Sequence, residues 1–314
     1  MGPSVPRRPR RPRETVIAVA APTDTVVPAD AAALAGRLEP LHSQIYFVPE
    51  VGEELAPLGI TKPRAQYFAQ RAAPMGAVGP GVVAATFFNF NAGLVARSVP
   101  GVWASAAPAD VVNARLRAAD SSLRRLLGEQ VSSAAVTESA ELARKACEGA
   151  TGEDRPLYAA HADLPWPDEP HLMLWHAVTL LREHRGDAHL HALLSAGLSG
   201  IEALITHVAT GTGFTVGFAQ QSRGWSPEQW SEASAGLAER GLLDGDGALT
   251  EDGAALRREI EEHTTRMSLG PWRHLGTEGM ARLAEVSRPL SKAVLPAFAV
   301  EGVFSPRSPR APKG

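Results

Sequence analysis

Cysteine and aromatic residues are scarce in this chain. Cys147 is the only cysteine among 314 residues, which excludes an intramolecular disulfide and a cysteine-rich metal site. Aromatic residues make up 6% of the chain, whereas 44% is hydrophobic and dominated by alanine and leucine, a mixture that favours helices over sheets. No apolar run approaches the roughly 18 residues that a membrane helix needs. We therefore expect a mainly α-helical protein of the reducing cytoplasm that does not contact a membrane.

Motifs for common cofactors are also missing. The chain contains no G-x-S-x-G, P-loop or G-x-G-x-x-G sequence, and Gly79-Pro80-Gly81 is too short to cradle a phosphate group. The pairs His184/His189 and His189/His191 lack the i, i+4 spacing with a following glutamate that marks zinc proteases. We accordingly expect neither a cofactor nor a bound metal, and we expect Cys147 to be an unreactive thiol late in a helix.

The net charge of −3 conceals an uneven distribution along the chain. Residues 1–13 carry five arginines and no acid, and residues 303–314 carry Arg307, Arg310 and Lys313 and no acid. The body between them, residues 14–302, has 23 basic and 34 acidic residues. Two basic ends therefore flank an acidic body.

Proline-rich stretches divide the chain into regions. Residues 1–29 and 303–314 are rich in proline and basic residues, and we expect both to be disordered tails. Residues 151–170 contain four prolines and are expected to form an irregular linker. Two helical lobes remain, an N-terminal lobe over residues 30–150 and a C-terminal lobe over residues 171–302.

Prolines and small polar residues mark the expected helix starts. We expect helices over residues 28–41 (continuing toward 53 with a bend at Pro49), 63–72, 80–98, 108–127, 138–148 and 171–184. The last of these is expected to break at Gly186 and to restart with Asp187 as its N-cap.

The C-terminal lobe carries a helix–turn–helix pattern followed by a short acidic turn. Ser226-Pro227-Glu228 starts a helix, with a serine cap, a proline in the first turn and an acid near the positive end. Behind this helix we expect a turn over Asp244–Gly247, a short strand over residues 248–250 and a long helix over residues 254–267. The spacing of "RGLL", "ALT" and "DGAALR" resembles the MarR-type winged-helix regulators, which implies a winged-helix-like lobe with one small β-hairpin.

A wider resemblance covers about residues 30–300. Its matching pieces are "HSQIYFVPE" (42–50), "YFAQRAAPMGAV" (67–78), "ATFFNF" (85–90), "LVARSVPGVW" (94–103), "LPWPDEPHLMLWHAVTLLREHRGDAH" (164–189), "QQSRGWSPEQW" (220–230) and "GLLDGDGALTEDGAALR" (241–257). These pieces are similar to an actinobacterial family of helix-turn-helix or MarR-like proteins to which no settled activity is attached. The resemblance implies that "REHRGD" (182–187) and the pieces from the first lobe matter for function.

The surface that would read DNA in such a fold carries the wrong charge. Residues 226–262 contain ten acidic residues and only Arg240, Arg257 and Arg258, whereas phosphate contacts need lysine and arginine. On the exposed start of the helix that follows the serine cap, only Gln229 resembles a residue that reads bases. We therefore do not expect DNA to bind through this wing, although the arginine-rich N-terminus could add phosphate contacts.

Residues 171–191 form the densest group of titratable side chains and hold five of the ten histidines. His176, Thr179, Glu183 and Asp187 fall on one face if the segment is a continuous helix. In a functional interpretation the catalytic acid–base candidates are His176, Glu183 and His184, and Arg182 and Arg185 would hold an anionic or carbonyl group of the substrate. Asp187 is a further candidate for substrate binding. In a structural interpretation the charged residues form a salt-bridge network between the lobes, and the histidines lie on the helix surface.

A second polar set belongs to the first lobe. His42, Tyr46 and Glu50 are spaced i, i+4, i+8, so they share one helix face if the bend at Pro49 permits. Together with Arg71 and Asn89 they either line a pocket or satisfy one another's hydrogen bonds. The run around Asn89 contains three phenylalanines and is more typical of a hydrophobic core with one buried amide than of a cofactor site.

Two functions from different classes follow from these patterns. In the first, the winged-helix-like fold is repurposed to bind a small organic molecule between the lobes, either as a binding protein or as an enzyme. In the second, the protein is a ligand-responsive transcription regulator of MarR type. A scaffold role is a third hypothesis, in which the acidic wing contacts a partner protein, and a homodimer is compatible with all three.

Overall fold

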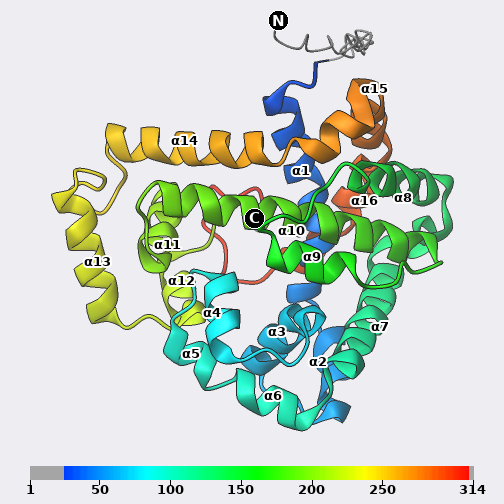
Figure 1. Cartoon of the computed structure of the whole chain (residues 1–314), viewed down its shortest axis with the longest axis horizontal. Coiled ribbons are helices and arrows are strands. Elements are labelled where there is room, and N and C mark those ends of the chain that lie inside the picture. The colour runs from blue at the N-terminus through cyan, green and yellow to red at the C-terminus, as the bar shows by residue number, and fades with distance from the viewer. Residues whose placement is uncertain (1–24, 311–314) are drawn as a thin grey trace, which may run out of the picture.

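The computed structural model describes residues 25–310, and most of them belong to helices joined by turns and loops (Figure 1). The first helices are α1 (Pro28–Ser43), α2 (Glu50–Leu55), α3 (Pro63–Ala72), α4 (Pro80–Phe87), α5 (Ala92–Ala96), α6 (Val99–Ser105), α7 (Pro108–Leu127) and α8 (Ala134–Cys147). The remaining helices are α9 (Pro156–Ala162), α10 (Pro170–Ser195), α11 (Gly200–Ala209), α12 (Val216–Arg223), α13 (Pro227–Glu239), α14 (Glu251–Met267), α15 (Gly270–Val286) and α16 (Arg288–Ala293). The mainly α-helical class expected from the composition is confirmed.

Proline opens many of the helices. Pro28, Pro108 and Pro170 each stand at the first helical position, where the missing N–H removes no intrahelical hydrogen bond and the fixed φ suits the helix. The start of α13 follows the expected pattern in detail. The Ser226 side chain accepts a hydrogen bond from the backbone of Gln229, and the Gln229 side chain accepts one from the backbone of Ser226.

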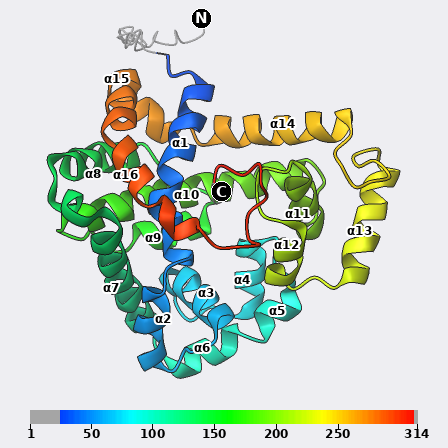
Figure 2. The same cartoon turned by 180° about the vertical axis from the view of Figure 1, so that it is seen from behind.

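Helix α10 crosses the centre of the molecule (Figures 1 and 2). It packs against α1, α7, α8, α9 and α14. Its 26 residues run without interruption, so the break expected at Gly186 and the cap expected at Asp187 are wrong. A glycine inside a helix costs only about 1 kcal/mol, and the packing of α10 on so many neighbours outweighs that cost.

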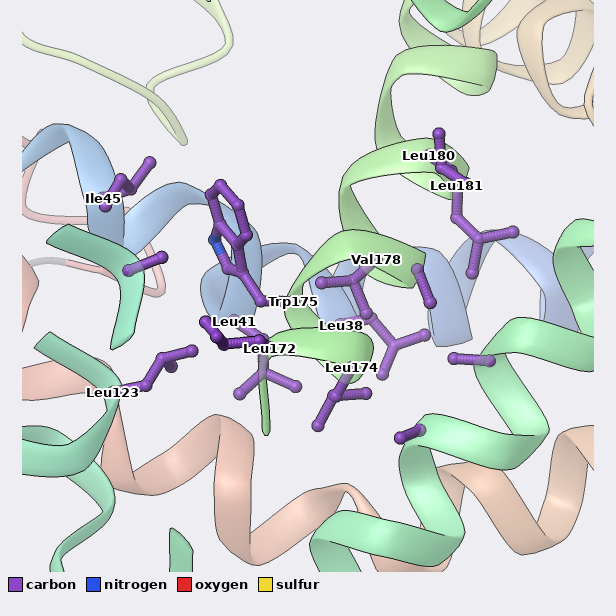
Figure 3. Packing of buried hydrophobic residues seen from close by; sticks show 14 of the residues in the cluster. Leu38, Leu41, Ile45, Leu123, Leu172, Leu174, Trp175, Val178, Leu180 and Leu181 are labelled. Carbon is purple, nitrogen blue, oxygen red and sulfur yellow. The ribbon is translucent and has the colours of Figure 1, made fainter. Parts of the chain in front are cut away.

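The largest hydrophobic core surrounds α10 (Figure 3). Figure 3 shows its central side chains, among them Leu38, Leu41, Ile45, Leu123, Leu172, Leu174, Trp175, Val178, Leu180 and Leu181. This core draws residues from both sides of the interval 151–170, so it crosses the boundary expected between two lobes. The interval itself contains α9, which also packs against α10, and is therefore not irregular throughout.

No β-strand occurs in residues 25–310, so the small β-hairpin expected after α13 is wrong. A single antiparallel bridge joins Leu243 and Leu249. Between them the Asp244 carboxylate accepts hydrogen bonds from the backbone of Asp246 and Ala248, at 3.0 and 2.9 Å. This tight turn satisfies its own backbone locally and leaves no length for a ladder of paired strands.

The C-terminal segment (residues 299–310) packs back onto the body, whereas we expected a disordered tail from residue 303 onward. Val303 and Phe304 are buried in a small aromatic core. The Arg310 guanidinium forms an ion pair with the Glu39 carboxylate of α1. The buried apolar side chains explain why this proline-rich stretch is ordered. Residues 1–24 and 311–314 lie outside the described residues, but Pro28 and Ala29 of the expected N-terminal tail already belong to α1.

Within residues 25–310 no single helix is long and apolar enough to cross a membrane. Helices α10 and α11 meet that requirement only as a pair, and the pair is bent by 101°.

Candidate ligand-binding cavity

A cavity of about 380 Å³ lies between α1, α3, α10, α12 and the C-terminal segment. We call it the arginine–aromatic cavity, after the residues that dominate its wall. The aromatic members are Tyr46, Phe47, Tyr67, Phe68, Phe90, Phe214 and Phe218, and the charged members are Glu39, Arg64, Arg182, Arg223 and Arg310. Sites for small organic molecules are usually concave and apolar with a few convergent polar groups, and this cavity has that composition.

A smaller cavity of about 170 Å³ adjoins it. The two cavities share Tyr67, Phe90, Arg182 and Arg223 in their walls. Of the residues singled out in the sequence, the smaller cavity brings together Arg71, Asn89, Arg182, Glu183 and Asp187. The "REHRGD" segment of α10 and the polar residues of the first lobe therefore meet at one place.

Glu183 forms ion pairs with two arginines in the wall of the smaller cavity. Its side chain is 1% exposed, and its Oε2 accepts hydrogen bonds from Arg71 at 3.2 Å and from Arg182 at 2.7 Å. Burial alone would raise the pKa of Glu183, but Arg182 and Arg71 outweigh burial and hold that pKa well below its usual value. Glu183 is therefore a fixed anion that orients two arginines.

His42 connects α1 to α10 through a chain of hydrogen bonds. The Thr179 hydroxyl donates to the carbonyl of Trp175 (2.7 Å), so its oxygen is free to accept from Nδ1–H of His42 (2.9 Å). Burial and the nearby Arg182 hold the pKa of His42 well below its usual value, so the ring is neutral and its Nε2 is an acceptor. The Tyr46 hydroxyl then donates to Nε2 at 3.0 Å.

Glu50 does not join this chain. It lies on α2, where its carboxylate accepts two hydrogen bonds from Arg125 of α7, at 2.6 and 3.0 Å. The turn after the short 3₁₀ helix Gln44–Tyr46 interrupts the helix face that His42, Tyr46 and Glu50 were expected to share. The structure thus brings together the first two of these three residues and separates the third.

The histidines predicted as acid–base groups lie elsewhere on α10. His176 packs edge-on against Trp166, and His184 packs edge-on against Tyr158. Burial, reinforced by a nearby arginine in each case, lowers the pKa of both histidines to about 4. Neither histidine lines the two cavities, so the structure does not assemble His176, Glu183 and His184 into one set.

The remaining predicted residues of α10 make structural contacts. The Arg185 guanidinium donates to the carboxylate of Glu261 on α14 at 2.6 Å. The Asp187 carboxylate accepts a hydrogen bond from the backbone N–H of Tyr158 at 2.9 Å, and burial raises the pKa of Asp187. Both contacts tie α10 to a neighbouring element, but neither is a salt bridge between the two expected lobes; of the ion pairs that these charged residues of α10 form, Arg71–Glu183 joins the lobes.

Two residues of the cavity wall, Tyr67 and Arg223, were missed by sequence reasoning. The Tyr67 hydroxyl accepts a hydrogen bond from Arg71 at 3.1 Å. The Arg223 guanidinium lies over the rings of Phe90 and Phe214, and its buried Nε has no hydrogen-bond partner in the described part of the chain. Both residues fall inside pieces noted for their resemblance, "YFAQRAAPMGAV" and "QQSRGWSPEQW", but nothing in the pattern assigned them a role.

The charges around the two cavities do not balance. Arg71 and Arg182 share the Glu183 carboxylate, Glu39 pairs with Arg310, and Arg223 has no ion pair with a carboxylate in residues 25–310. The Asp187 carboxylate accepts a backbone hydrogen bond, and burial favours its neutral form. Buried cations without a partner are costly. The site therefore has positive charge to offer to a bound anion.

Helices α12 and α13 form a helix–turn–helix unit whose turn is held by the first part of the chain. Gly224 takes a left-handed conformation (φ 75°) between the two helices. The carbonyl of Arg223 accepts from the backbone of Asn91 at 2.9 Å, and the Trp225 indole donates to the carbonyl of Asn89 at 2.9 Å. The same α12 supplies Arg223 to the cavity, so the helix–turn–helix unit and the cavity share one element.

Metal binding finds no support in the geometry. Within residues 25–310, no group of three or more histidine, cysteine, aspartate or glutamate side chains is placed to hold an ion. Cys147 is buried, and burial raises the pKa of its thiol to about 12.

Comparison with known proteins gives one match. A family model described as "Helix-turn-helix family" matches residues 31–301. No curated protein and no solved structure matches the chain.

Proposed function

The chain belongs to this helix-turn-helix family, and on that premise we propose that it binds a small aromatic organic anion in the arginine–aromatic cavity. The observation that carries the proposal is the cavity itself, where aromatic rings lie beside Arg223, an arginine that has no acidic partner within residues 25–310. A planar apolar group would lie against the rings, and an acid group would take the place of the missing counter-ion of Arg223.

The aromatic wall favours a planar ligand. Tyr67, Phe68 and Phe90 pack with ring centroids 5.1 to 5.8 Å apart, so they form a rigid surface. Phe214 and Phe218, also in the cavity wall, have ring centroids 5.0 Å apart and connect α12 to the C-terminal segment. A flat ring system packed against these rings would remove much apolar surface from water.

The helix–turn–helix unit would sense such a ligand directly. Phe218, Ser222 and Arg223 of α12 line the cavity, and α13 begins after the three-residue turn that follows Arg223. A ligand that favours one position of α12 therefore biases the position of α13, which is the physical requirement for coupling between the two sites.

Calorimetric titration with 2-naphthoate and its neutral analogue 2-naphthamide tests the proposal. We expect the carboxylate to bind at least about tenfold more tightly, because only the carboxylate brings a negative charge to the hydrogen bonds with Arg223. The Arg223→Met variant should lose about 10- to 100-fold of the naphthoate affinity, which corresponds to about 1.5–3 kcal/mol.

The matched control is Arg273→Met, which removes an exposed arginine of α15 far from the cavity wall. It should bind naphthoate like the wild type. Equal affinity for the acid and the amide, or an unchanged affinity in Arg223→Met, would overturn the proposal.

A ligand-responsive transcription regulator of MarR type is the second candidate function, and the family match favours it. In helix–turn–helix proteins the N-terminal end of the second helix contacts base edges. Here that end is α13, where the Asn91 side chain donates to Gln229 at 3.3 Å and the surrounding surface is acidic. We therefore propose that this surface does not bind DNA.

A gel-shift assay against the protein's own promoter region at low salt tests this point. We expect no retardation by a variant that lacks residues 1–13, because only the basic N-terminus would supply phosphate contacts. Retardation that survives this deletion and disappears in Gln229→Ala would restore the regulator function.

A further inference from the structure

We propose that Tyr67 is the proton acceptor of a proton-transfer site in the arginine–aromatic cavity, acting on an aromatic acid that carries an ionisable O–H or an acidic C–H beside a carbonyl. This inference rests on the proposed function, since it places a reaction on the ligand of the same cavity. Glu183 and a singly charged ligand together carry two negative charges, whereas Arg71, Arg182 and Arg223 carry three positive charges. An ionised Tyr67 would supply the third negative charge.

Arg71 connects Tyr67 to Glu183 through two hydrogen bonds. The side chain of Arg71 donates to the phenol oxygen at 3.1 Å, and Arg71 in turn is held by the Glu183 carboxylate at 3.2 Å. A guanidinium can only donate, so this contact stabilises a phenolate more than a phenol. Tyr67 lines both cavities, which places its ring where a bound molecule would lie.

The charged groups that face Tyr67 come from three helices. Arg71 lies on α3, Arg223 on α12, and Arg182 and Glu183 on α10. Burial alone would raise the pKa of Tyr67, but Arg71, Arg223 and Arg182 together outweigh it and lower the pKa below its usual value. The cavity thus favours the ionised form of a group that is normally protonated at neutral pH.

Tyr46 provides a contrast in the same wall. Its ring centroid lies 5.4 Å from that of Tyr67, but its hydroxyl donates to the neutral His42 instead of accepting from an arginine. Burial raises the pKa of Tyr46. Two neighbouring groups whose pKa values are pushed in opposite directions are typical of an acid–base pair, in which Tyr67 accepts a proton and Tyr46 keeps one.

The proposed step needs no further reactant. The O–H or C–H bond of the substrate breaks, its proton moves to the Tyr67 oxygen, and the electron pair stays on the substrate. The negative charge therefore passes from the phenolate to the substrate, where Arg223 and Arg182 stabilise it. Return of the proton to water or to another position of the substrate restores the phenolate.

Tyrosine titration by ultraviolet difference absorbance tests the ionisation without any ligand. The chain has three tyrosines, Tyr46, Tyr67 and Tyr158, so single steps can be resolved. We expect one step below the usual value of about 10, lost in Tyr67→Phe and kept in Tyr46→Phe and Tyr158→Phe. Because Tyr67→Phe could fail to fold, ¹³C labelling of the tyrosine rings follows the same step by NMR in the wild type.

Hydrogen–deuterium exchange of phenylpyruvate tests the transfer itself. This probe is an aromatic acid with an acidic C–H beside a carbonyl, and its exchange in D₂O is followed by NMR. We expect the wild type to accelerate exchange about 10²-fold over Tyr67→Phe. Absence of the early tyrosine step, or equal exchange with the two proteins, would overturn the inference.

Calorimetry with 2-naphthoate on the same proteins separates this inference from the proposed function. Naphthoate has no exchangeable acidic C–H, so its binding to the wild type reports on the ligand class without any proton transfer. If naphthoate binds and exchange does not depend on Tyr67, only the proton-transfer inference fails. If the early tyrosine step is present and naphthoate does not bind, the proposed ligand class fails instead.

Discussion

The free energy of unfolding should fall steeply as the pH is lowered from about 7 to about 5. His42, His161, His176 and His184 are all buried. Burial lowers the pKa of His161 to about 3 and of His176 and His184 to about 4, and holds the pKa of His42 well below its usual value. Each histidine is therefore neutral in the folded protein at a pH where the unfolded chain already binds a proton.

The sign of the effect follows from proton uptake. An unfolded histidine titrates near pH 6.5, so below that pH the unfolded state binds more protons than the folded state and stability decreases as the pH falls. The loss continues until the folded pKa is reached. At pH 5 each such histidine contributes a loss on the order of 2 kcal/mol, and four of them approach the total stability of about 5–15 kcal/mol of a typical domain.

Buried carboxylates do not account for this pH window. Arg182 and Arg71 hold the pKa of Glu183 so low that its contribution is lost only at far lower pH. Burial raises the pKa of Asp187, so the folded state binds a proton there before the unfolded state does. The free energy of unfolding therefore gains from Asp187 as the pH falls. The decrease between about pH 7 and pH 5 is therefore expected to come from the histidines.

Urea denaturation at several pH values measures the effect. The His176→Phe variant removes a titrating group whose Nε2 has no hydrogen-bond partner in the described part of the chain. Its stability should depend on pH less steeply, by up to about 1.4 kcal/mol per pH unit below pH 6. His191→Gln is the control, because the His191 side chain is 37% exposed. Parallel curves for wild type and His176→Phe would contradict the prediction.

The same histidines show what the sequence could and could not predict. Their clustering and the share of apolar neighbours were visible in the chain, and so was the pairing of His42 with Tyr46 at i, i+4. Whether His176 and His184 face a cavity or a core depends on which helices cover α10. That is decided by contacts with Trp166 and Tyr158, which lie on other elements, and no local pattern contains them.

Helix boundaries were predicted best where the signal is local. The serine cap at Ser226 and the prolines at helix starts depend on a few adjacent residues, and they are confirmed. The continuity of α10 through Gly186 was missed because packing on five helices overrides a local penalty. The ordered C-terminal segment was missed for a similar reason, since Phe304 finds its partners, such as Phe214, far away in the sequence.

The sequence pointed to only some of the residues of the candidate site. Sequence reasoning selected Arg71 and Glu183 separately, and the structure joins them in one ion pair. It did not select Tyr67 or Arg223, because a tyrosine and an arginine in helical segments are ordinary residues until a fold surrounds them with charge. The electrostatic environment of a side chain depends on its position in three dimensions, so the sequence alone could not single out these two residues.

Replacing Glu183 by glutamine should lower the free energy of unfolding by about 3–5 kcal/mol. The substitution keeps the shape of the side chain and removes the charge that faces Arg71 and Arg182. Because Glu183 is 1% exposed, water cannot replace it, and Arg71 is left as a buried cation without a counter-ion. Urea denaturation at pH 8 measures the change away from the titration of the histidines.

Glu54→Gln provides the matched control. Glu54 pairs with Arg117 at 2.7 Å, but the side chains are 29% and 57% exposed, and such pairs contribute about 0–1 kcal/mol. The double variant Arg71→Met/Glu183→Leu should recover part of the loss seen in Glu183→Gln, because it removes the buried cation together with its partner and Arg182 reaches solvent. If Glu183→Gln and Glu54→Gln destabilise the protein equally, the arginines at this site do not need a counter-ion, and the inferred demand of the cavity for a bound anion loses its basis.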